Sequence, residues 1–165
     1  MQIKHINPDN LQIMNATSAY KVSPYADKIL SLLDPNSPNK GYFKPSEKNK
    51  VLFFDDEEEL SNLYKLPNLM HIHMALEFVD NISPNDKVII HCEAGRSRST
   101  AMAIGCLIYS GMKVREAVEK VFELRPKAIP NNLIIRLFEQ ELNLETNQIR
   151  SIVEEHYNKN DVHYN

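Results

Sequence analysis

The chain has 165 residues, of which 42% are hydrophobic and 25% charged, and its formal net charge is −3 with an isoelectric point near 6.1. This length and composition fit a single domain over residues 1–165, and we expect a frayed tail at 158–165. No basic stripe and no long apolar run are present, so neither nucleic acid nor a membrane is an expected partner, and we expect a monomer.

The hydrophobic pattern predicts strands and helices in alternation along the chain. A short helix is expected over residues 7–15, where Pro8 suits an early helical position. Apolar runs predict strands at 28–33, 50–54 and 87–91, separated in the first case by a long Pro- and Gly-containing loop. Helical spacing of apolar residues predicts five further helices, at 67–81, 97–110, 114–124, 131–143 and 146–157. This alternation predicts an α/β fold of three layers, with a mainly parallel central sheet flanked by helices.

The most informative stretch is His-Cys-Glu-Ala-Gly-Arg-Ser-Arg-Ser-Thr, which begins at His91 and continues the central strand. It places the thiol of Cys92 at the end of that strand and Arg98 six positions later, where a helix begins. Such a strand-to-helix loop directs backbone amides and the positive helix end toward one point, which suits a tetrahedral dianion. We therefore expect the following residues to bind a phosphate group: Glu93, Ala94, Gly95, Arg96, Ser97 and Arg98.

Each residue type in this loop suits the binding of an anion or the attack of a thiolate for a chemical reason. The thiolate is the nucleophilic form of cysteine, and converging amides together with Arg98 favour it. The planar guanidinium of Arg98 pairs with two phosphoryl oxygens at once, which lysine cannot do. Gly95 permits a positive φ, which lets successive amides point at one anion. We expect Ser99 to donate a hydrogen bond to the Cys92 sulfur, and His91 to be a buried strand-end histidine that supports the loop.

Other polar residues near the motif have plainer interpretations. Arg96 is either a solvated loop arginine or a residue that favours a substrate with extra negative charge. Cys106 lies about 12 Å from Arg98 along the predicted helix, so we expect a small core residue and not a disulfide partner of Cys92. His71 and His73 point to different sides of a helix and cannot share a metal, so we expect no metal and no cofactor.

The pattern His-Cys, five residues, Arg and Ser resembles the signature of the cysteine-dependent protein phosphatases, in the compact tyrosine and dual-specificity branch. Residues 125–134 also resemble that branch, and residues 30–35 and 51–56 are similar to segments of small bacterial and phage members. The resemblance runs from about residue 28 to 155. It implies that Cys92 is the nucleophile, that Arg98 binds two phosphate oxygens, and that Ser99 helps the thiolate leave the phosphoenzyme.

The resemblance also implies a carboxylate general acid on a separate loop upstream of Cys92. The candidates are Asp55 and Asp56, at the end of the strand predicted at 50–54. We choose Asp56, because Asp55 continues the strand and its direction is fixed by the sheet, whereas Asp56 is the first residue free to leave it. Asp55 remains the alternative, and the acidic run 55–59 is also typical of a solvated turn. An inserted segment at 61–67 explains the long separation from Cys92.

These observations predict a protein tyrosine or dual-specificity phosphatase that acts through a phosphocysteine intermediate on a phosphorylated protein or a small phosphomonoester. One alternative is a non-protein substrate such as a phosphoinositide. Another is rhodanese-like sulfur transfer, which needs no upstream acid. A pseudophosphatase that only reads phosphate ranks last, since the nucleophile, the arginine and a candidate acid are all present. A free Cys92 requires a reducing compartment, so we expect the cytoplasm.

Overall fold

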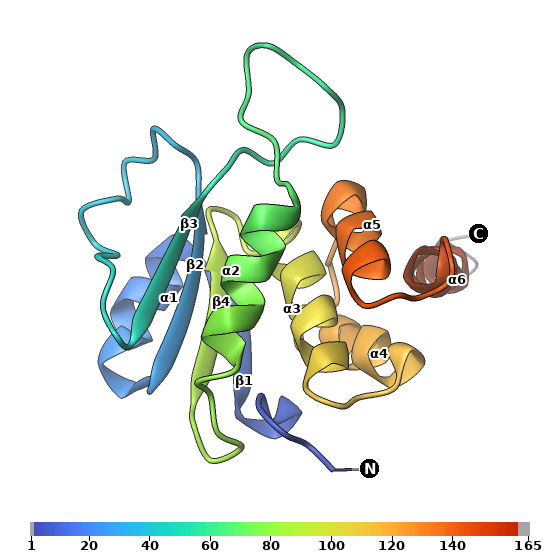
Figure 1. The fold of residues 1–165 in the computed structure, drawn as a ribbon, viewed down its shortest axis with the longest axis horizontal. Helices are drawn as coiled ribbons and strands as arrows, with labels where there is room; N and C mark the ends of the chain where they lie inside the picture. Colours follow the sequence, from blue (N-terminus) through green and yellow to red (C-terminus); the bar gives the residue numbers. More distant parts are fainter. Residues whose placement is uncertain (1, 162–165) are drawn as a thin grey trace.

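Four parallel strands form the centre of the structure, a computed structural model that describes residues 2–161 (Figure 1). The strands are β1 (Leu11–Asn15), β2 (Lys28–Leu33), β3 (Asn49–Phe53) and β4 (Val88–Cys92), in the order β1-β4-β2-β3. The central strand β4 pairs Cys92 with Asn15 of β1 and His91 with Ser31 of β2. All of these pairings are parallel, so the predicted parallel sheet with the motif at the end of a central strand is confirmed.

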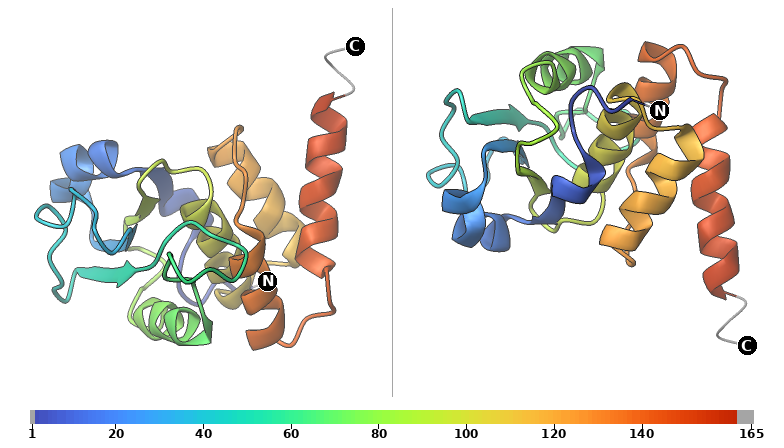
Figure 2. Two further views of the ribbon diagram at one scale, coloured as in Figure 1. Left: turned by 90° about the horizontal axis from the view of Figure 1, so that it is seen from above. Right: turned by 90° about the horizontal axis from the view of Figure 1, so that it is seen from below.

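Six α-helices flank the sheet in the described part of the chain. They are α1 (Ala16–Val22), α2 (Leu69–Val79), α3 (Arg98–Tyr109), α4 (Val114–Leu124), α5 (Asn132–Glu141) and α6 (Gln148–Asp161). Helix α1 covers one face of the sheet, whereas α2 and α3 cover the other. Helices α4 and α5 pack on α3, and α6 packs on α4 and α5 at the side far from the sheet (Figure 2). The predicted three-layer α/β architecture is therefore confirmed.

The central strand is buried on both faces, as its continuous apolar sequence predicts. Side chains alternate along it, so that Val88, Ile90 and Cys92 join the core beneath α3, while Ile89 joins the smaller core beneath α1. Helix α3 lies close to its neighbours because it is rich in small residues. At Gly105 an added Cβ would collide with the ring of Phe138 in α5, so this glycine allows the two helices to approach.

The helix predicted at residues 7–15 is wrong. Only Pro8–Asn10 form a short 3₁₀ helix, and Leu11–Asn15 form the edge strand β1. The alternation in which Leu11 and Ile13 are buried and Gln12 is exposed is a strand period, and pairing with β4 stabilises it. An unpredicted helix, α1, follows this strand directly, and the Asn15 side chain caps it by accepting a hydrogen bond from the Ser18 amide at 2.8 Å.

Helix α6 continues to Asp161, so residues 158–161 are helical, and the frayed tail expected at 158–165 stays a prediction. Lys159 in the last turn of this helix interacts favourably with the negative end of the helix dipole. Residues 162–165 lie outside the described part of the structure. None of the helices within residues 2–161 is both long and apolar enough to cross a bilayer.

Candidate active site

The loop from Cys92 to Arg98 joins the end of β4 to the first turn of α3. The Cys92 side chain is buried, with 2% of its surface exposed, and its Sγ accepts a hydrogen bond from the Gly95 amide at 3.2 Å. Sγ is also hydrogen-bonded to Ser99 Oγ at 3.2 Å. The loop thus surrounds the sulfur with a backbone donor, a hydroxyl and the positive end of α3, three groups that interact favourably with negative charge.

Gly95 has a φ of 69°, as the sequence predicts. A Cβ at this position would collide with the backbone of Met14 and Asn15 in β1, so glycine is required for space as well as for conformation. The Gly95 carbonyl accepts a hydrogen bond from Arg125 Nε at 3.0 Å. The loop is therefore fixed from both sides, by β1 and by the segment that follows α4.

Arg98 is 4% exposed, and its guanidinium is held from one side. Nη1 donates to Asp34 Oδ1 at 2.7 Å and to the Phe54 carbonyl at 2.8 Å. Nε is buried and has no hydrogen-bond partner among the described residues. Because a buried donor without a partner is costly, the Nε edge of the guanidinium is suited to receive an anion.

Two further polar residues, Asp34 and Asn39, support the loop from the segment that follows β2, and the sequence analysis missed both. The Glu93 carboxylate accepts hydrogen bonds from Asn39 Nδ2 at 2.7 Å and from the Asp34 amide at 3.4 Å. Glu93 therefore directs its side chain to the loop after β2. One signal for Asp34 is present in the sequence. It directly follows a strand parallel to β4, and so it must lie at the same carboxyl-terminal end of the sheet as Cys92.

Asp56 lies at the cavity that Cys92 and Arg98 also line. Its Oδ1 accepts hydrogen bonds from Ser97 Oγ at 2.7 Å and from Asn131 Nδ2 at 2.9 Å. Asn131 also caps α5, because its Oδ1 accepts from the Ile134 amide at 3.0 Å. Both donors converge on one oxygen of Asp56, which leaves the other oxygen available for a proton.

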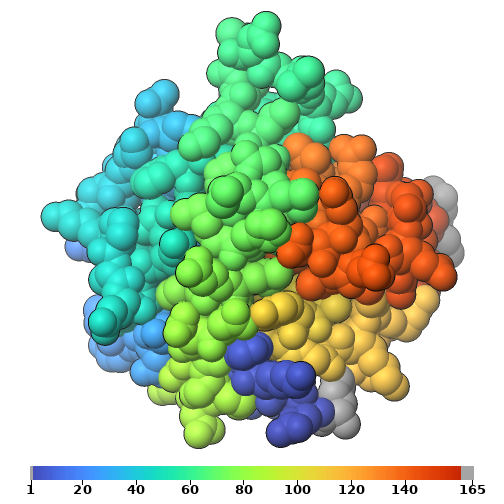
Figure 3. Space-filling model, in the orientation of Figure 1, coloured from blue at the N-terminus to red at the C-terminus, as the bar shows by residue number. Residues whose placement is uncertain are grey.

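Asp55 has a different position. Its Oδ2 accepts a hydrogen bond from the Lys65 amide at 2.7 Å, and its own amide donates to the Lys65 carbonyl at 2.7 Å. Asp55 therefore joins the two ends of the loop between β3 and α2, which protrudes at the top of the molecule (Figure 3). The structure brings Asp56, and not Asp55, to the cavity with Cys92.

His91 is fully buried beneath the loop. Its Nε2 lies 2.7 Å from Ser31 Oγ and its Nδ1 lies 3.3 Å from the Cys92 carbonyl, while its ring packs on Phe43 with 4.1 Å between the centroids. Burial lowers the pKa of His91 to about 4, and this effect exceeds the opposing effects of the Cys92 carbonyl and Glu93. The imidazole is therefore neutral at pH 7 and serves as a packed, hydrogen-bonded support.

Arg96 lies at the mouth of the cavity. Its Nε donates to the Lys127 carbonyl at 3.2 Å, and its own carbonyl accepts from the Ile129 amide at 2.9 Å. Arg96 forms no ion pair within the described residues.

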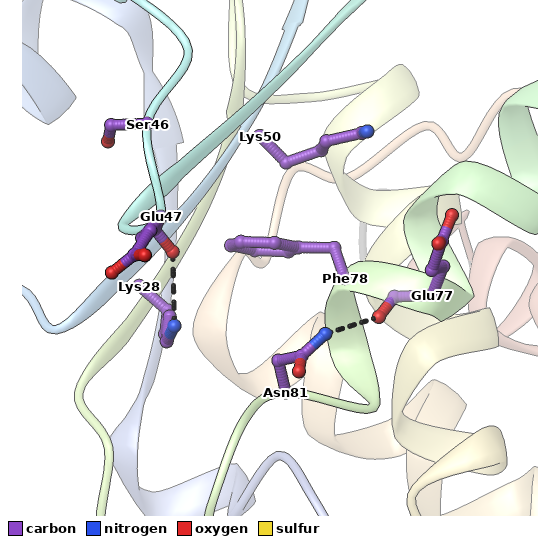
Figure 4. A pocket seen from close by; sticks show the side chains of 7 residues that line it. All are labelled: Lys28, Ser46, Glu47, Lys50, Glu77, Phe78 and Asn81. Atoms are coloured by element: carbon purple, nitrogen blue, oxygen red, sulfur yellow. Dashed lines mark hydrogen bonds between the residues drawn. The ribbon is translucent and has the colours of Figure 1, made fainter.

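The cavity at this loop has a volume of about 330 Å³ and is lined by Asp56, Cys92, Glu93, Ala94, Arg96, Ser97, Arg98 and Ile129. A larger cavity of about 530 Å³ lies at the opposite, amino-terminal end of the strands (Figure 4). There Lys28 donates to the Glu47 carbonyl and Asn81 to the Glu77 carbonyl, beside the ring of Phe78. Its lining includes neither a cysteine nor an arginine, so the smaller cavity is the candidate active site.

Metal binding and disulfide formation depend on how the His, Cys, Asp and Glu side chains of the described residues are arranged. Within residues 2–161, no group of three or more His, Cys, Asp or Glu side chains is arranged to hold a metal ion. Both cysteines are free. Cys106 is fully buried in α3, and burial raises the pKa of its thiol to about 12, so it is an inert core residue as the sequence predicts.

Comparison with known proteins identifies a family. Residues 33–143 match the profile of the dual specificity phosphatase catalytic domain. A putative tyrosine phosphatase of Invertebrate iridescent virus 6 is 30% identical over 138 residues, which cover 80% of this chain and 87% of the viral protein. The dual specificity protein phosphatase Mpk3 of Drosophila melanogaster is 28% identical over 131 residues, or 76% of this chain, but the match spans only 30% of the fly protein.

Solved structures show the same fold. The human tyrosine phosphatase-like serine/threonine/tyrosine-interacting protein superposes with a TM-score of 0.60 at 22% identity, over 82% of this chain and 92% of that one. The Yvh1 phosphatase domain from Chaetomium thermophilum superposes with a TM-score of 0.57 at 24% identity, over 81% and 90% of the two chains. The profile match covers more than half of the chain, so the protein belongs to the dual specificity phosphatase family that its Cys92 motif resembles.

Proposed function

We propose that the protein hydrolyses phosphate monoesters of tyrosine, and of serine or threonine, in phosphorylated proteins. In the first step the Cys92 thiolate attacks phosphorus, so that an S–P bond forms while the P–O ester bond breaks. The electron pair of that bond moves to the leaving oxygen, which takes a proton from Asp56. The products of this step are the free hydroxyl of the substrate and a phosphocysteine.

In the second step a water molecule attacks the phosphocysteine. The Asp56 carboxylate accepts a proton from this water, the S–P bond breaks, and its electron pair returns to Cys92 Sγ. Ser99 donates a hydrogen bond to the departing thiolate from its position 3.2 Å from Sγ. Inorganic phosphate is released, and both Cys92 and Asp56 return to their starting protonation states.

The observation that carries this proposal is the buried, unpartnered Nε of Arg98, a residue that lines one cavity with Cys92 and Asp56. Asp34 and the Phe54 carbonyl use Nη1 and fix the guanidinium plane. The remaining edge of that plane fits two oxygens of a phosphoryl group. The loop amides and the helix end supply further charge stabilisation where negative charge develops.

The test is turnover of an aryl phosphate and of phosphotyrosine and phosphothreonine peptides by Cys92→Ser, with Cys106→Ser as the matched control. Cys92→Ser is expected to abolish hydrolysis, while thermal unfolding and phosphate binding stay close to the parent. Cys106→Ser is expected to keep catalysis in its folded fraction, and EDTA is expected to change neither protein. Hydrolysis by Cys92→Ser would overturn the proposal.

The substrate class rests on family membership and on the charges at the cavity. The acidic run 55–59 beside the site disfavours highly anionic lipids such as phosphoinositides, and a comparison of phosphopeptides with inositol phosphates tests this. Sulfur transfer, which needs no carboxylate near the thiol, leaves the position of Asp56 unexplained. We also infer that the protein acts as a monomer in the cytoplasm, since one chain supplies every site residue and Cys92 must stay reduced.

A further inference from the structure

The loop that carries Asp56 is closed at its base and free at its tip. Asp55 and Lys65 form two hydrogen bonds of 2.7 Å, which define residues 55–65 as the acid loop. At the tip, Leu60 and Leu63 are 91% and 85% exposed, so they do not pack on the core. The base alone does not place Asp56 over the Cys92 loop, and other contacts must do so.

One of those contacts is the hydrogen bond from Ser97 Oγ to Asp56, and the others are made to the start of α5. Asn131 Nδ2 donates to Asp56 Oδ1 and, at 3.2 Å, to the Glu57 carbonyl. The next residue of the loop contacts the next residue of the helix. Glu58 Oε1 accepts a hydrogen bond from the Asn132 amide at 2.8 Å, and Glu58 Oε2 accepts one from Asn132 Nδ2 at 3.3 Å. Side chains of the acid loop and side chains at the start of α5 therefore both contribute to the contact between them.

The Glu58 contact is favourable for two reasons. Asn132 is the first residue of α5, and its amide has no acceptor within the helix. A carboxylate at a helix N-terminus also interacts favourably with the helix dipole. Of the three glutamates in the acidic run, Glu58 alone has a side-chain hydrogen bond within the described structure, so its role differs from that of its neighbour Glu59.

We propose that Glu58 is a positioning residue that holds the acid loop on α5, so that Asp56 stands over the Cys92 loop before a substrate binds. This inference rests on the proposed role of Asp56 as the general acid. Glu58 touches neither the substrate site nor the reacting atoms, and its effect on turnover passes through Asp56. Asn131 contributes to the same arrangement but also caps α5, so Glu58 is the cleaner position to test.

The experiment compares Glu58→Ala and Glu58→Gln with Glu59→Ala, on a series of aryl phosphates whose leaving groups range from good to poor. Good leaving groups need no proton in the first step, so Glu58→Ala is expected to leave their rate of phosphocysteine formation, measured as the initial burst of product, unchanged. For poor leaving groups we expect a loss of about 3- to 10-fold in kcat with KM nearly constant, together with a weaker alkaline limb of the pH profile. Glu58→Gln keeps an oxygen that accepts from Asn132 and is expected to restore most of the loss, and Glu59→Ala is expected to match the parent.

Hydrogen exchange gives a second measurement that does not depend on turnover. The Asn132 amide is expected to exchange faster in Glu58→Ala than in the parent or in Glu59→Ala, with the global melting temperature little changed. Asp56→Asn is assayed in parallel. If Asp56→Asn shows the loss for poor leaving groups and Glu58→Ala does not, Glu58 has no positioning role while the proposed function stands. If Asp56→Asn itself shows no such loss, both the general acid assignment and this inference fail.

Discussion

Arg98 donates a hydrogen bond of 2.7 Å from Nη1 to Asp34 Oδ1, which joins the first turn of α3 to the residue that follows β2. Asp34 is 42% exposed on its side chain, whereas Arg98 is only 4% exposed. The pair therefore lies where a buried cation meets a partly solvated carboxylate. Its main effect is geometric, because it fixes the plane in which Arg98 meets a phosphoryl group.

The first prediction concerns Arg98→Lys. Lysine keeps the positive charge but has a single ammonium group, so it cannot contact Asp34 and two phosphate oxygens in the same plane. We expect kcat/KM for an aryl phosphate to fall by roughly 10²- to 10³-fold, the usual effect of losing a transition-state donor. Steady-state kinetics and the inhibition constant for inorganic phosphate measure the effect.

Arg96→Lys is the matched control for this experiment. Arg96 lies in the same loop, and its Nε contacts only the Lys127 carbonyl. We expect nearly parental kinetics for this variant with an aryl phosphate. The opposite ranking, with Arg98→Lys active and Arg96→Lys inactive, would make Arg96 the phosphate ligand.

The second prediction separates the two candidate acids. Asp56→Asn removes the proton that the leaving group needs, so hydrolysis of poor leaving groups is expected to fall by roughly 10²-fold, with a much smaller effect on good ones. The alkaline limb of the pH profile is expected to disappear. The comparison of kcat across a series of aryl phosphates measures the first effect, and the pH profile of kcat measures the second.

Asp55→Asn is expected to lack this signature. Asp55 holds the Lys65 amide at the base of the acid loop, and asparagine can still accept that hydrogen bond. If Asp55→Asn showed the dependence on the leaving group and Asp56→Asn did not, the general acid would be Asp55. If neither variant showed it, the acid would lie elsewhere on the protein.

The third prediction assigns Ser99 to the second step. Its hydroxyl is hydrogen-bonded to Cys92 Sγ at 3.2 Å and is fully buried. Ser99→Ala removes a donor to the departing thiolate, which corresponds to roughly a 10- to 100-fold slower breakdown of the phosphocysteine. Rapid mixing is expected to show a burst of product followed by slow turnover. A uniform loss without a burst would instead place the effect of Ser99 in the first step.

The nucleophile loop and the strands β2, β3 and β4 could be predicted from sequence because their signals are local. The apolar strand, Cys92, Gly95 and Arg98 all lie within one short segment, and the continuous apolar run of β4 predicts burial on both faces. The choice of Asp56 over Asp55 also follows from a local signal, the position of each residue relative to the end of the strand. The structure brings Asp56 to the cavity, although its position depends on α5 as well as on the end of β3.

The missed features depend on contacts between distant parts of the chain. β1 has few residues of strong strand preference, and its pairing with β4 decides its conformation. Asp34 and Asn39 contact Glu93 across sequence separations of 59 and 54 residues, and Asp34 is marked only by its place after a strand and Asn39 by no local pattern. The contact of Glu58 with α5 spans 74 residues. Periodicity and motif spacing carry no information about such pairs.

The last prediction concerns stability and the buried imidazole beneath the loop. Burial lowers the pKa of His91 from 6.5 to about 4 in the folded protein, so the unfolded chain takes up this proton more readily. The contribution of neutral His91 to the stability of the folded protein is therefore fully present above pH 6.5 and is lost as the pH falls toward 4. The difference between the two values corresponds to roughly 3 kcal/mol in the free energy of unfolding.

Urea unfolding at pH 7, 6, 5 and 4 measures this dependence in the parent and in two variants. His91→Gln removes the titrating group, so we expect a lower free energy of unfolding at pH 7 but a shallower decline toward pH 4. His73→Gln is the matched control, because His73 is 52% exposed on its side chain and pairs with Glu141 at the surface. We expect this control to lack the flattening seen in His91→Gln. If the decline in His91→Gln were as steep as in the parent, other groups would cause the acid sensitivity, and the neutral His91 would have no part in it.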